Sequence, residues 1–483
     1  MQSRRDQVQA HLFVMSRLAA GMLRAEPDVP DIPTGRTTRG IRTGLLIGVA
    51  IALVMALYGV IVPGGATAWR KPGTLIVVKD TGARYLFIGG ALHPVLNQAS
   101  ARLLAGQKMA LAQVTERSLK GAPRGGPVGI VGAPDPLPAA GSLTDAGWLA
   151  CAVRATAPSG TAAPRLALAI APVRRGNPLT AAQGVLISTP DGAQYLLWRG
   201  RRLGLDTAGG APRALGYTSA APFPVTEAFL NTLPAGPDLA APAIPGRGNA
   251  GPELAGRPTR LGQLFTGPAG EHYVLGTGGL EQLTTTLFEL LRGDPRTQRD
   301  AYGGAPATAA PIGADDLAAH PAAAPAAGGL PAEPPALLAP AQGQSVCAEL
   351  EPAAAGPRTL VTVADAATVG GAPPTAQPGV RPGCAGADLI SVRPGGGALV
   401  RALSGAGVGS TLYLVADNGV KYPLPAAGTA KRLGYGAVTP VAVPGSLLTL
   451  LPTGPSLDPD VLLGGGVALS ATSPQPCTAT GTG

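Results

Sequence analysis

A stretch of nineteen residues without a charged side chain, at 44–62, constrains the fold of this chain more than any other feature. As an α-helix it would be roughly 28 Å long, which matches the hydrocarbon core of a bilayer. Inside lipid the backbone has to satisfy its own hydrogen bonds, so a lone apolar stretch of this length can only be helical. The sequence therefore predicts one transmembrane helix at 44–62, with a leader at 1–43 before it.

The charges beside this stretch predict its orientation. Arg36, Arg39 and Arg42 precede it closely, whereas Arg70 and Lys71 follow only after seven uncharged residues. By the positive-inside rule, the leader is expected in the cytosol and the residues after the span outside the cell inner (plasma) membrane, in a single-pass protein. A cleaved signal peptide is the alternative, but this leader is too long for the charged region of such a peptide.

The leader has the pattern of an amphipathic helix, because apolar residues recur every three or four positions with arginines between them. The apolar positions are Val8, Leu12, Met15, Ala19, Met22 and Leu23. A tail of this length has no core of its own to cover. We therefore expect the helix to dock on a partner protein or on the inner leaflet of the membrane.

One face of the predicted span carries small residues at a spacing of four, namely Gly44, Gly48, Ala52 and Ala56. Such a face lets a second transmembrane helix approach closely, so it is a candidate helix-packing surface. Glycine and alanine are frequent throughout this chain, however. Chance alignment therefore explains the spacing equally well.

Composition favours a folded region after the span that is rich in loops. The chain has 70 glycines and 51 prolines among 483 residues, but its hydrophobic fraction of 45% is ordinary. These values predict many short strands rather than disorder. The net charge of +9 is interpreted as thin and scattered after the span, which predicts no nucleic-acid partner.

A strand, a glycine turn and a tyrosine three residues after that glycine recur four times. The paired positions are Gly82 and Tyr85, Gly192 and Tyr195, Gly270 and Tyr273, and Gly419 and Tyr422. Asp-Gly or Asn-Gly supplies the positive φ of a tight turn, and the flanking residues suit half-buried strands. Each copy is therefore predicted to be a β-hairpin.

The second and fourth copies match over a longer stretch. Each continues with Leu-Gly-Tyr, at 215–217 and 433–435, and then with Leu-Pro-x-Gly-Pro, at 233–237 and 451–455. Between these motifs, residues 225–233 and 443–451 are predicted to form short helices that cap the hairpins. Four related units at uneven spacing indicate an elongated, duplicated architecture.

The predicted fold class is a single transmembrane helix plus an exported, β-rich α+β domain, in which a central sheet domain is flanked by four related β-hairpin-based repeat domains. The repeats are expected at 73–127, 184–247, 258–302 and 410–462. The central domain is expected from 128–180 and 345–403, an Ala/Pro/Gly-rich linker at 303–344, and a tail at 463–483.

All four cysteines, Cys151, Cys347, Cys384 and Cys477, follow the span, on the side expected to be oxidising. An even count there predicts two disulfides, and the spacing leaves all three pairings open. Free, buried thiols are the alternative. A bond between Cys151 and Cys347 would join the two halves of the central domain. It would clasp the base of the arm that carries the second and third repeats.

Motifs for catalysis are missing from the sequence. There is no GxxxxGK[ST] phosphate loop, no GxSxG elbow, no SxxK and no HExxH. Neither a Cys/His pattern for zinc nor another metal-ligand spacing occurs. The sequence therefore predicts no catalytic residue, no cofactor and no metal site.

Several segments together resemble the EccB family, a core membrane component of the ESX, or type VII, secretion system of actinobacteria. They are the leader with its span, the block from Trp69 to Gly106, the paired LGY and LPxGP motifs and the late ISVRPGGGALVRAL. The resemblance covers nearly the whole chain and is weakest at 303–344 and after residue 461.

The resemblance implies a structural subunit with its larger part outside the membrane and a disulfide that maps onto Cys151 and Cys347. Cys384 and Cys477 are further disulfide candidates, and their pairing stays open. It also implies an EccC-type ATPase, EccD, EccE and other copies of the chain as partners. Some family members have been described as ATPases, so hydrolysis of ATP by the exported domain is the alternative function. A membrane-anchored module that binds the cell wall is a second alternative.

Overall fold

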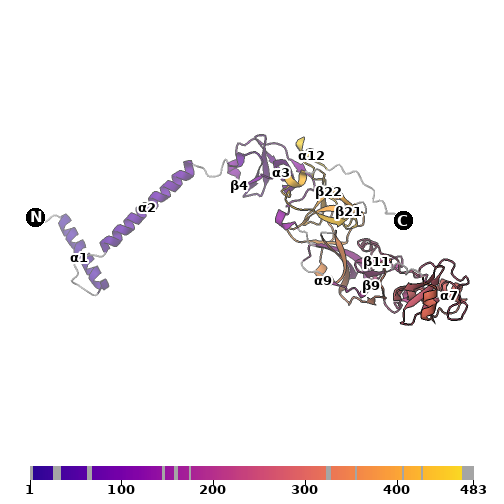
Figure 1. Ribbon diagram of the computed structural model, residues 1–483. Helices are drawn as coiled ribbons and strands as arrows, with labels where there is room; N and C mark the ends of the chain where they lie inside the picture. The colour runs from indigo at the N-terminus through magenta and orange to yellow at the C-terminus, as the bar shows by residue number, and fades with distance from the viewer. Residues whose placement is uncertain are drawn as a thin grey trace. The chain divides into compact units, whose positions relative to one another are not determined.

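The structure is a computed structural model of the chain, and it describes residues 4–24, 34–61, 68–143, 147–156, 162–172, 176–321, 328–353, 356–404, 407–425 and 428–469 (Figure 1). Two long helices come first along the chain, and short strands dominate after residue 73. One apolar helix followed by a β-rich region with several sheets confirms the predicted fold class.

The N-terminal helices are α1 (Arg4–Arg24) and α2 (Thr34–Ile61). Within α2, Thr37–Gly59 is long and apolar enough to cross a membrane, and none of it is buried. The apolar side chains of α1 are likewise exposed, for example Leu12 at 63%. Helix α2 begins ten residues before the predicted span, and Val62 lies outside the described residues.

Four small sheets hold the hairpin units. The first has β1 (Thr74–Val78), β2 (Arg84–Ile88), β3 (Ala91–Pro94) and β4 (Ala110–Val114). The second has β9 (Gln183–Ser188), β10 (Gln194–Trp198), β11 (Arg201–Gly204) and β12 (Phe223–Pro224). The third has β13 (Leu264–Thr266), β14 (His272–Gly276), β15 (Gly279–Leu283) and β16 (Ala310–Pro311). The fourth has β21 (Ala398–Ser404), β22 (Gly407–Val415), β23 (Lys421–Leu424) and β24 (Val441–Pro444).

All four sheets have the same strand order. The third strand of each unit pairs with the second, the second with the first, and the first with the fourth. In the last three units, the first three strands are antiparallel and the fourth is parallel to the first. A parallel fourth strand requires a crossover, and short helices occupy it in each unit.

The crossover and capping helices are α3 (Gln98–Ala105), α4 (Ala211–Ala214), α6 (Thr285–Gly293), α7 (Pro295–Tyr302) and α10 (Thr429–Arg432) before the fourth strands, and α5 (Glu227–Leu230), α8 (Ala314–Ala319) and α11 (Gly445–Leu448) after them. Helices α5 and α11 lie within the ranges predicted for capping helices. Helix α12 (Asp460–Leu463) precedes β25 (Val467–Ala468), which pairs with β5 (Gly129–Ile130).

An extended segment covers the outer edge of the third strand in three units, and we call these segments straps. In each case a residue of the third strand donates its N–H to a proline carbonyl and accepts from the glycine two residues later. These contacts join Leu92 to Pro123 and Gly125, Arg202 to Pro234 and Gly236, and Lys421 to Pro452 and Gly454, at 2.8–3.0 Å. Two straps are therefore the LPxGP motifs. The strap at 123–125 makes the same contacts with Pro123 and Gly125 but lacks the leucine and the second proline of the motif, so the search for repeats missed it.

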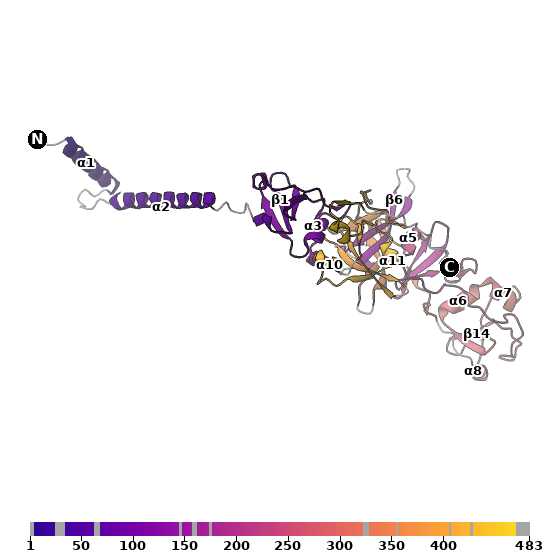
Figure 2. The ribbon, with the colours of Figure 1, turned by 90° about the horizontal axis from the view of Figure 1, so that it is seen from above.

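The central sheet has six strands in the order β20-β7-β6-β18-β19-β8. They are β6 (Trp148–Thr156), β7 (Ala162–Ile170), β8 (Asn177–Pro178), β18 (Gln344–Glu351), β19 (Arg358–Asp365) and β20 (Leu389–Val392). Figure 2 shows the purple strand β6 among orange strands from much later in the chain. The sheet is therefore assembled from two chain segments that are separated by the second and third units.

Alternate residues of the central strands enter two different cores. On one face Trp148, Ala150 and Leu168 join a cluster that also contains Ile187 and Phe223 of the second unit and Val400 and Val443 of the fourth. On the other face Leu149, Cys151 and Ala167 pack with Cys347 and with Val369 of α9 (Ala366–Val369). The second and fourth units thus share one hydrophobic core with the central sheet.

Sheet membership corrects two of the predicted domain limits. Residues 303–344 are more than a linker, because β16 pairs with β13 in the third unit and β17 (Ala336–Leu337) pairs with β9 in the second. Strand β21 begins in the range predicted for the central domain, 345–403, but it pairs with β22 and β24 of the fourth unit. The remaining limits stay predictions.

Candidate functional site: the disulfide-bonded centre and its hairpin units

The centre of the molecule is the pair β6–β18, in which Cys151 and Cys347 lie directly opposite each other. They form a disulfide between residues 196 apart in sequence, with their Cα atoms 4.0 Å apart. Both side chains are fully buried. In the chain-entropy model, closing a loop of this length contributes about 5 kcal/mol at most to the free energy of unfolding.

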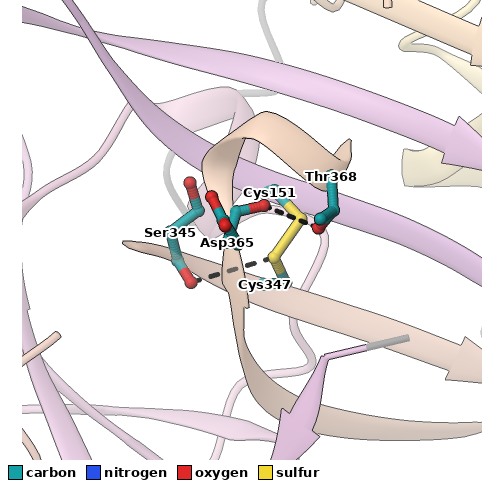
Figure 3. Close-up of a disulfide and its surroundings, with 5 residues drawn as sticks. All are labelled: Cys151, Ser345, Cys347, Asp365 and Thr368. Carbon is teal, nitrogen blue, oxygen red and sulfur yellow. Dashed lines mark hydrogen bonds between the residues drawn. A yellow bond between two sulfur atoms is a disulfide. The ribbon is translucent and has the colours of Figure 1, made fainter. Parts of the chain in front are cut away.

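Helix α9 covers the disulfide on its own side of the sheet (Figure 3). The side chain of Asp365 caps this helix by accepting from the N–H of Ala367 at 3.0 Å. The Oγ1 atom of Thr368 donates to the carbonyl of Asp365 at 2.7 Å. Water is therefore kept away from the disulfide by a short helix whose start is itself hydrogen-bonded.

The second predicted disulfide is only partly within the described residues. Cys384 is disulfide-bonded, whereas Cys477 lies outside the described residues. The pairing of Cys384 with Cys477 therefore stays a prediction.

The predicted turn glycines all have the positive φ that a tight turn needs. The φ values are 70° at Gly82, 87° at Gly192, 88° at Gly270 and 74° at Gly419. In the second and third units this turn joins the first strand to the second, and Tyr195 and Tyr273 lie on the second strand. Tyr85 lies at the matching place, opposite Pro94 of the third strand.

In the fourth unit, the matching of Gly419 and Tyr422 to the other three pairs is wrong. They lie at the turn between β22 and β23, which is the second hairpin of the unit. The tyrosine of this unit that corresponds to Tyr195 is Tyr413, because it lies on the second strand and pairs with Pro423 of the third strand, as Tyr195 pairs with Gly204. The strap contacts support this correspondence, because Lys421 of the fourth unit makes the contacts that Arg202 makes in the second unit. The sequence match failed because Asn-Gly occurs at the later turn of this unit.

The Leu-Gly-Tyr motifs place a tyrosine in each of two cores. Gly216 and Gly434 have φ values of 76° and 95° and end α4 and α10. The buried hydroxyl of Tyr217 then donates to the carbonyl of Pro335 at 2.9 Å, and that of Tyr435 to Pro138 at 2.8 Å. Burial raises the pKa of Tyr217 to about 12 and also raises the pKa of Tyr435. Both phenols are therefore neutral structural donors.

Lys421 is a buried cation at the end of a helix. Its Nζ donates to the carbonyl of Leu448, the last residue of α11, and to that of Leu451, three residues later. Burial lowers the pKa of this ammonium to about 8. At the same place in the second unit, Arg202 donates to the side chain of Asn231, the C-cap of α5, at 2.8 Å. A cation at a helix C-terminus is favourable, so both residues hold a capping helix.

A second buried charge holds the third unit. The carboxylate of Asp294 is fully buried and accepts from Nη1 of Arg247 at 2.6 Å. It also accepts from Arg296 at 3.1 Å and from Thr297 at 3.1 Å, and so caps α7. Burial raises the pKa of Asp294, but the bonds from Arg296, Arg247 and Thr297 outweigh it and hold the pKa below its usual value. Sequence analysis missed this pair, although Asp-Pro is a helix-start signal.

The predicted packing face of the span remains untested. All four residues of this face lie in α2 and are exposed, namely Gly44, Gly48, Ala52 and Ala56. An added Cβ at Gly44 or Gly48 would meet no atom within 4 Å.

The cavities differ in the polarity of their linings, and one of about 440 Å³ in the second unit is lined by Tyr195, Asp206 and Asp238. A groove of about 800 Å³ is lined mainly by valines, leucines and prolines, among them Leu399 and Val441. A smaller one of about 310 Å³ in the third unit has Arg257 as its single charged lining residue. Over the described ranges, no three His, Cys, Asp or Glu side chains are grouped to hold a metal ion.

Comparison with known proteins places these features in a family. A family model described as type VII secretion system ESX-1, transport TM domain B, matches residues 1–464. The chain belongs to the EccB family. It is therefore an EccB component of a type VII secretion system.

Relatives of EccB match over nearly the whole chain. The ESX-3 secretion system ATPase EccB3 of Mycolicibacterium smegmatis is 29% identical and covers 94% of this chain and 89% of the relative. The ESX-1 secretion system ATPase EccB1 of Mycobacterium tuberculosis is 28% identical and covers 95% and 93%. Both names describe these relatives as ATPases.

Solved structures share the fold. An EccB3 dimer from the ESX-3 core complex matches with a TM-score of 0.63 and 26% identity, over 80% of this chain and 98% of that chain. An intact ESX-5 inner membrane complex matches with a TM-score of 0.63 and 23% identity, over 95% of both chains.

Proposed function

We propose that this EccB protein is a structural, non-catalytic subunit of the secretion membrane complex. Helix α2 anchors it, and its hairpin units contact other subunits and further copies of the chain. The supporting observation is the shared core, in which two hairpin units and a disulfide-bonded central sheet form one hydrophobic body. The buried charges Asp294 and Lys421 are both engaged in holding helix ends. A rigid body of this kind suits assembly.

The orientation is proposed with the N-terminus in the cytosol and the hairpin units outside the membrane. Arg39 and Arg42 before the apolar stretch support it. The disulfide also supports it, because such bonds persist in oxidising compartments.

The partners proposed are an EccC-type ATPase, EccD and EccE, together with other copies of EccB. The match to a dimer of EccB3 from a core complex supports self-association. The exposed apolar face of α1, including Leu12 and Phe13, supports a docking role for the leader. The membrane is the remaining partner, and we propose no nucleic acid.

Hydrolysis of ATP is the second candidate, because the relatives are named ATPases. It would need a cavity with donors for phosphate oxygens. We favour the structural role, for which we propose no cofactor. If the protein hydrolyses nucleotide, ATP would be bound instead. A wall-binding module stays a further alternative, although aromatics make up only 4% of the chain.

The test is purification of tagged full-length protein from its native host in mild detergent. Under the structural role, a large ATPase and a polytopic membrane protein should be recovered in one particle. ATP hydrolysis should follow the large ATPase and should be absent from preparations of EccB alone. Recovery of EccB alone, with hydrolysis that stays with it, would establish the second candidate instead.

A further inference from the structure

The positive charge of the region after the span is concentrated in one segment. Residues 63–127 contain nine lysines and arginines but only two acidic residues, whereas residues 128–483 contain 21 basic and 22 acidic residues. The interpretation of this charge as scattered was therefore wrong. The whole positive excess lies in the segment that directly follows the transmembrane helix.

Most of the basic side chains in this segment are exposed, and within the described ranges they form no ion pair. Lys71, Lys79, Arg117 and Lys120 are exposed, and none of the ion pairs among the described residues includes them. Arg84 is the exception, since it pairs with Asp135 at 2.6 Å. The positive charge therefore faces solvent.

Three of these side chains gather at one end of the first sheet. The N–H of Lys79, just after β1, donates to the carbonyl of Val114 at the end of β4, at 2.9 Å. The short 3₁₀ helix η2 (Glu116–Leu119) follows directly and carries Arg117, with Lys120 next to it. The acidic residues of the segment, Asp80 and Glu116, lie at the same end and reduce its charge without cancelling it.

The segment is also held close to the bilayer by the chain itself. Helix α2 ends at Ile61, and the described chain resumes at Ala68. Seven Cα-to-Cα steps span at most about 25 Å when fully extended. The chain therefore keeps Ala68 within about 25 Å of the end of α2. An anionic surface attracts lysine and arginine over a Debye length of about 8 Å, so the first unit can bring its basic side chains to the headgroups.

We propose that Lys71, Lys79, Arg117 and Lys120 form a basic platform that rests on anionic phospholipid headgroups of the leaflet it faces. All four side chains are exposed. It requires α2 to lie in a bilayer, but it depends neither on the absence of catalysis nor on assembly with other subunits. Such contact would hold the first hairpin unit at the membrane surface.

The test measures lysine accessibility in full-length protein reconstituted into nanodiscs. One preparation contains phosphatidylcholine alone, and the other contains about one third phosphatidylglycerol. A water-soluble amine-reactive reagent is added, and the labelling rate of each lysine is read by mass spectrometry. Lys431 is the matched control, because it is exposed but lies in the fourth unit, outside the basic segment.

With anionic lipid, labelling of Lys79 and Lys120 should slow about threefold or more, and high salt should restore it. Labelling of Lys431 should not change. In an Arg117→Glu variant the protection of Lys79 should weaken, whereas Lys431→Glu should leave it intact. These variants change one exposed side chain each, so the fold should survive in both.

Equal labelling of Lys79 and Lys120 in the two lipids would overturn the proposal. Protection of Lys431 to the same degree would also overturn it, because the effect would then not belong to the segment. Protection that requires an added soluble acidic wall polymer instead of anionic lipid would assign the segment to a different ligand.

Discussion

Replacing Asp294 by asparagine tests how much a buried ion pair contributes to the third hairpin unit. Asparagine keeps the size of the side chain and one oxygen that can cap α7, and it is as good an N-cap as aspartate. It removes the negative charge, however. The guanidinium of Arg247, whose side chain is only 9% exposed, would then be buried without a counter-ion.

The magnitude follows from that uncompensated charge. Removing one partner of a buried ion pair costs about 3–5 kcal/mol of free energy of unfolding, most of it for the partner left behind. Since each 1.4 kcal/mol is a factor of ten in an equilibrium constant, local opening of α7 should increase by about 100-fold or more. The second cation bonded to Asp294, Arg296, adds little to this cost, because its side chain is 51% exposed and stays solvated in the variant.

The assay is amide hydrogen exchange of α7 in the full-length protein, compared between the wild type and Asp294→Asn. The control is Asp300→Asn, which makes the same chemical change on the same helix. Asp300 pairs with Arg299 at 2.9 Å, but the two side chains are 37% and 69% exposed. Such a pair contributes less than about 1 kcal/mol. If α7 exchanges no faster in Asp294→Asn than in Asp300→Asn, the argument from the buried pair is refuted.

Three further predictions concern the disulfide, a buried lysine and a turn. The double variant Cys151→Ser with Cys347→Ser should lose up to about 5 kcal/mol of free energy of unfolding, seen as faster proteolysis of the region after α2, and the reduced wild type should match it. Burial lowers the pKa of Lys421 to about 8, so between pH 8 and 10 the unfolded chain binds one proton more than the folded chain, and the resistance to denaturant should rise with pH. Lys421→Met should flatten this rise, whereas Lys431→Met should leave it unchanged. Gly200→Ala should displace the β10–β11 turn, because the added Cβ would lie 1.8 Å from the carbonyl oxygen of Thr359. In Gly192→Ala the added Cβ would meet no atom within 4 Å, so this variant should lose only about 1–2 kcal/mol through backbone strain. Thermal unfolding of both variants compares the two losses of stability.

The sequence predicted the features that depend on local pattern. The apolar stretch at 44–62 needs no partner to be recognised, because its length and lack of charge suffice. The turn glycines were found for the same reason, since a positive φ selects glycine at each turn. The capping helices at Glu227–Leu230 and Gly445–Leu448 followed from repetition of a long motif in two places.

Features that depend on pairing between distant strands were predicted less well. Strand β21 has the composition of any buried strand, and only its partners β22 and β24 assign it to the fourth unit. Two-residue strands such as β16 and β17 leave no period in the sequence, so 303–344 was taken for a linker. The pairing of Cys151 with Cys347 followed from the family resemblance, because spacing alone allowed three pairings.

The position of β18 inside the central sheet has a consequence for the order of folding. Strand β18 lies between β6 and β19, and it is synthesised only after both intervening hairpin units. Until then the hairpin β6–β7 has an open edge where β18 will pair, and Cys151 has no partner. The second and third units are therefore synthesised before the central sheet can be completed. The bond between residues 151 and 347 can therefore form only after those units have been made, and before β20 and the fourth unit need to be in place.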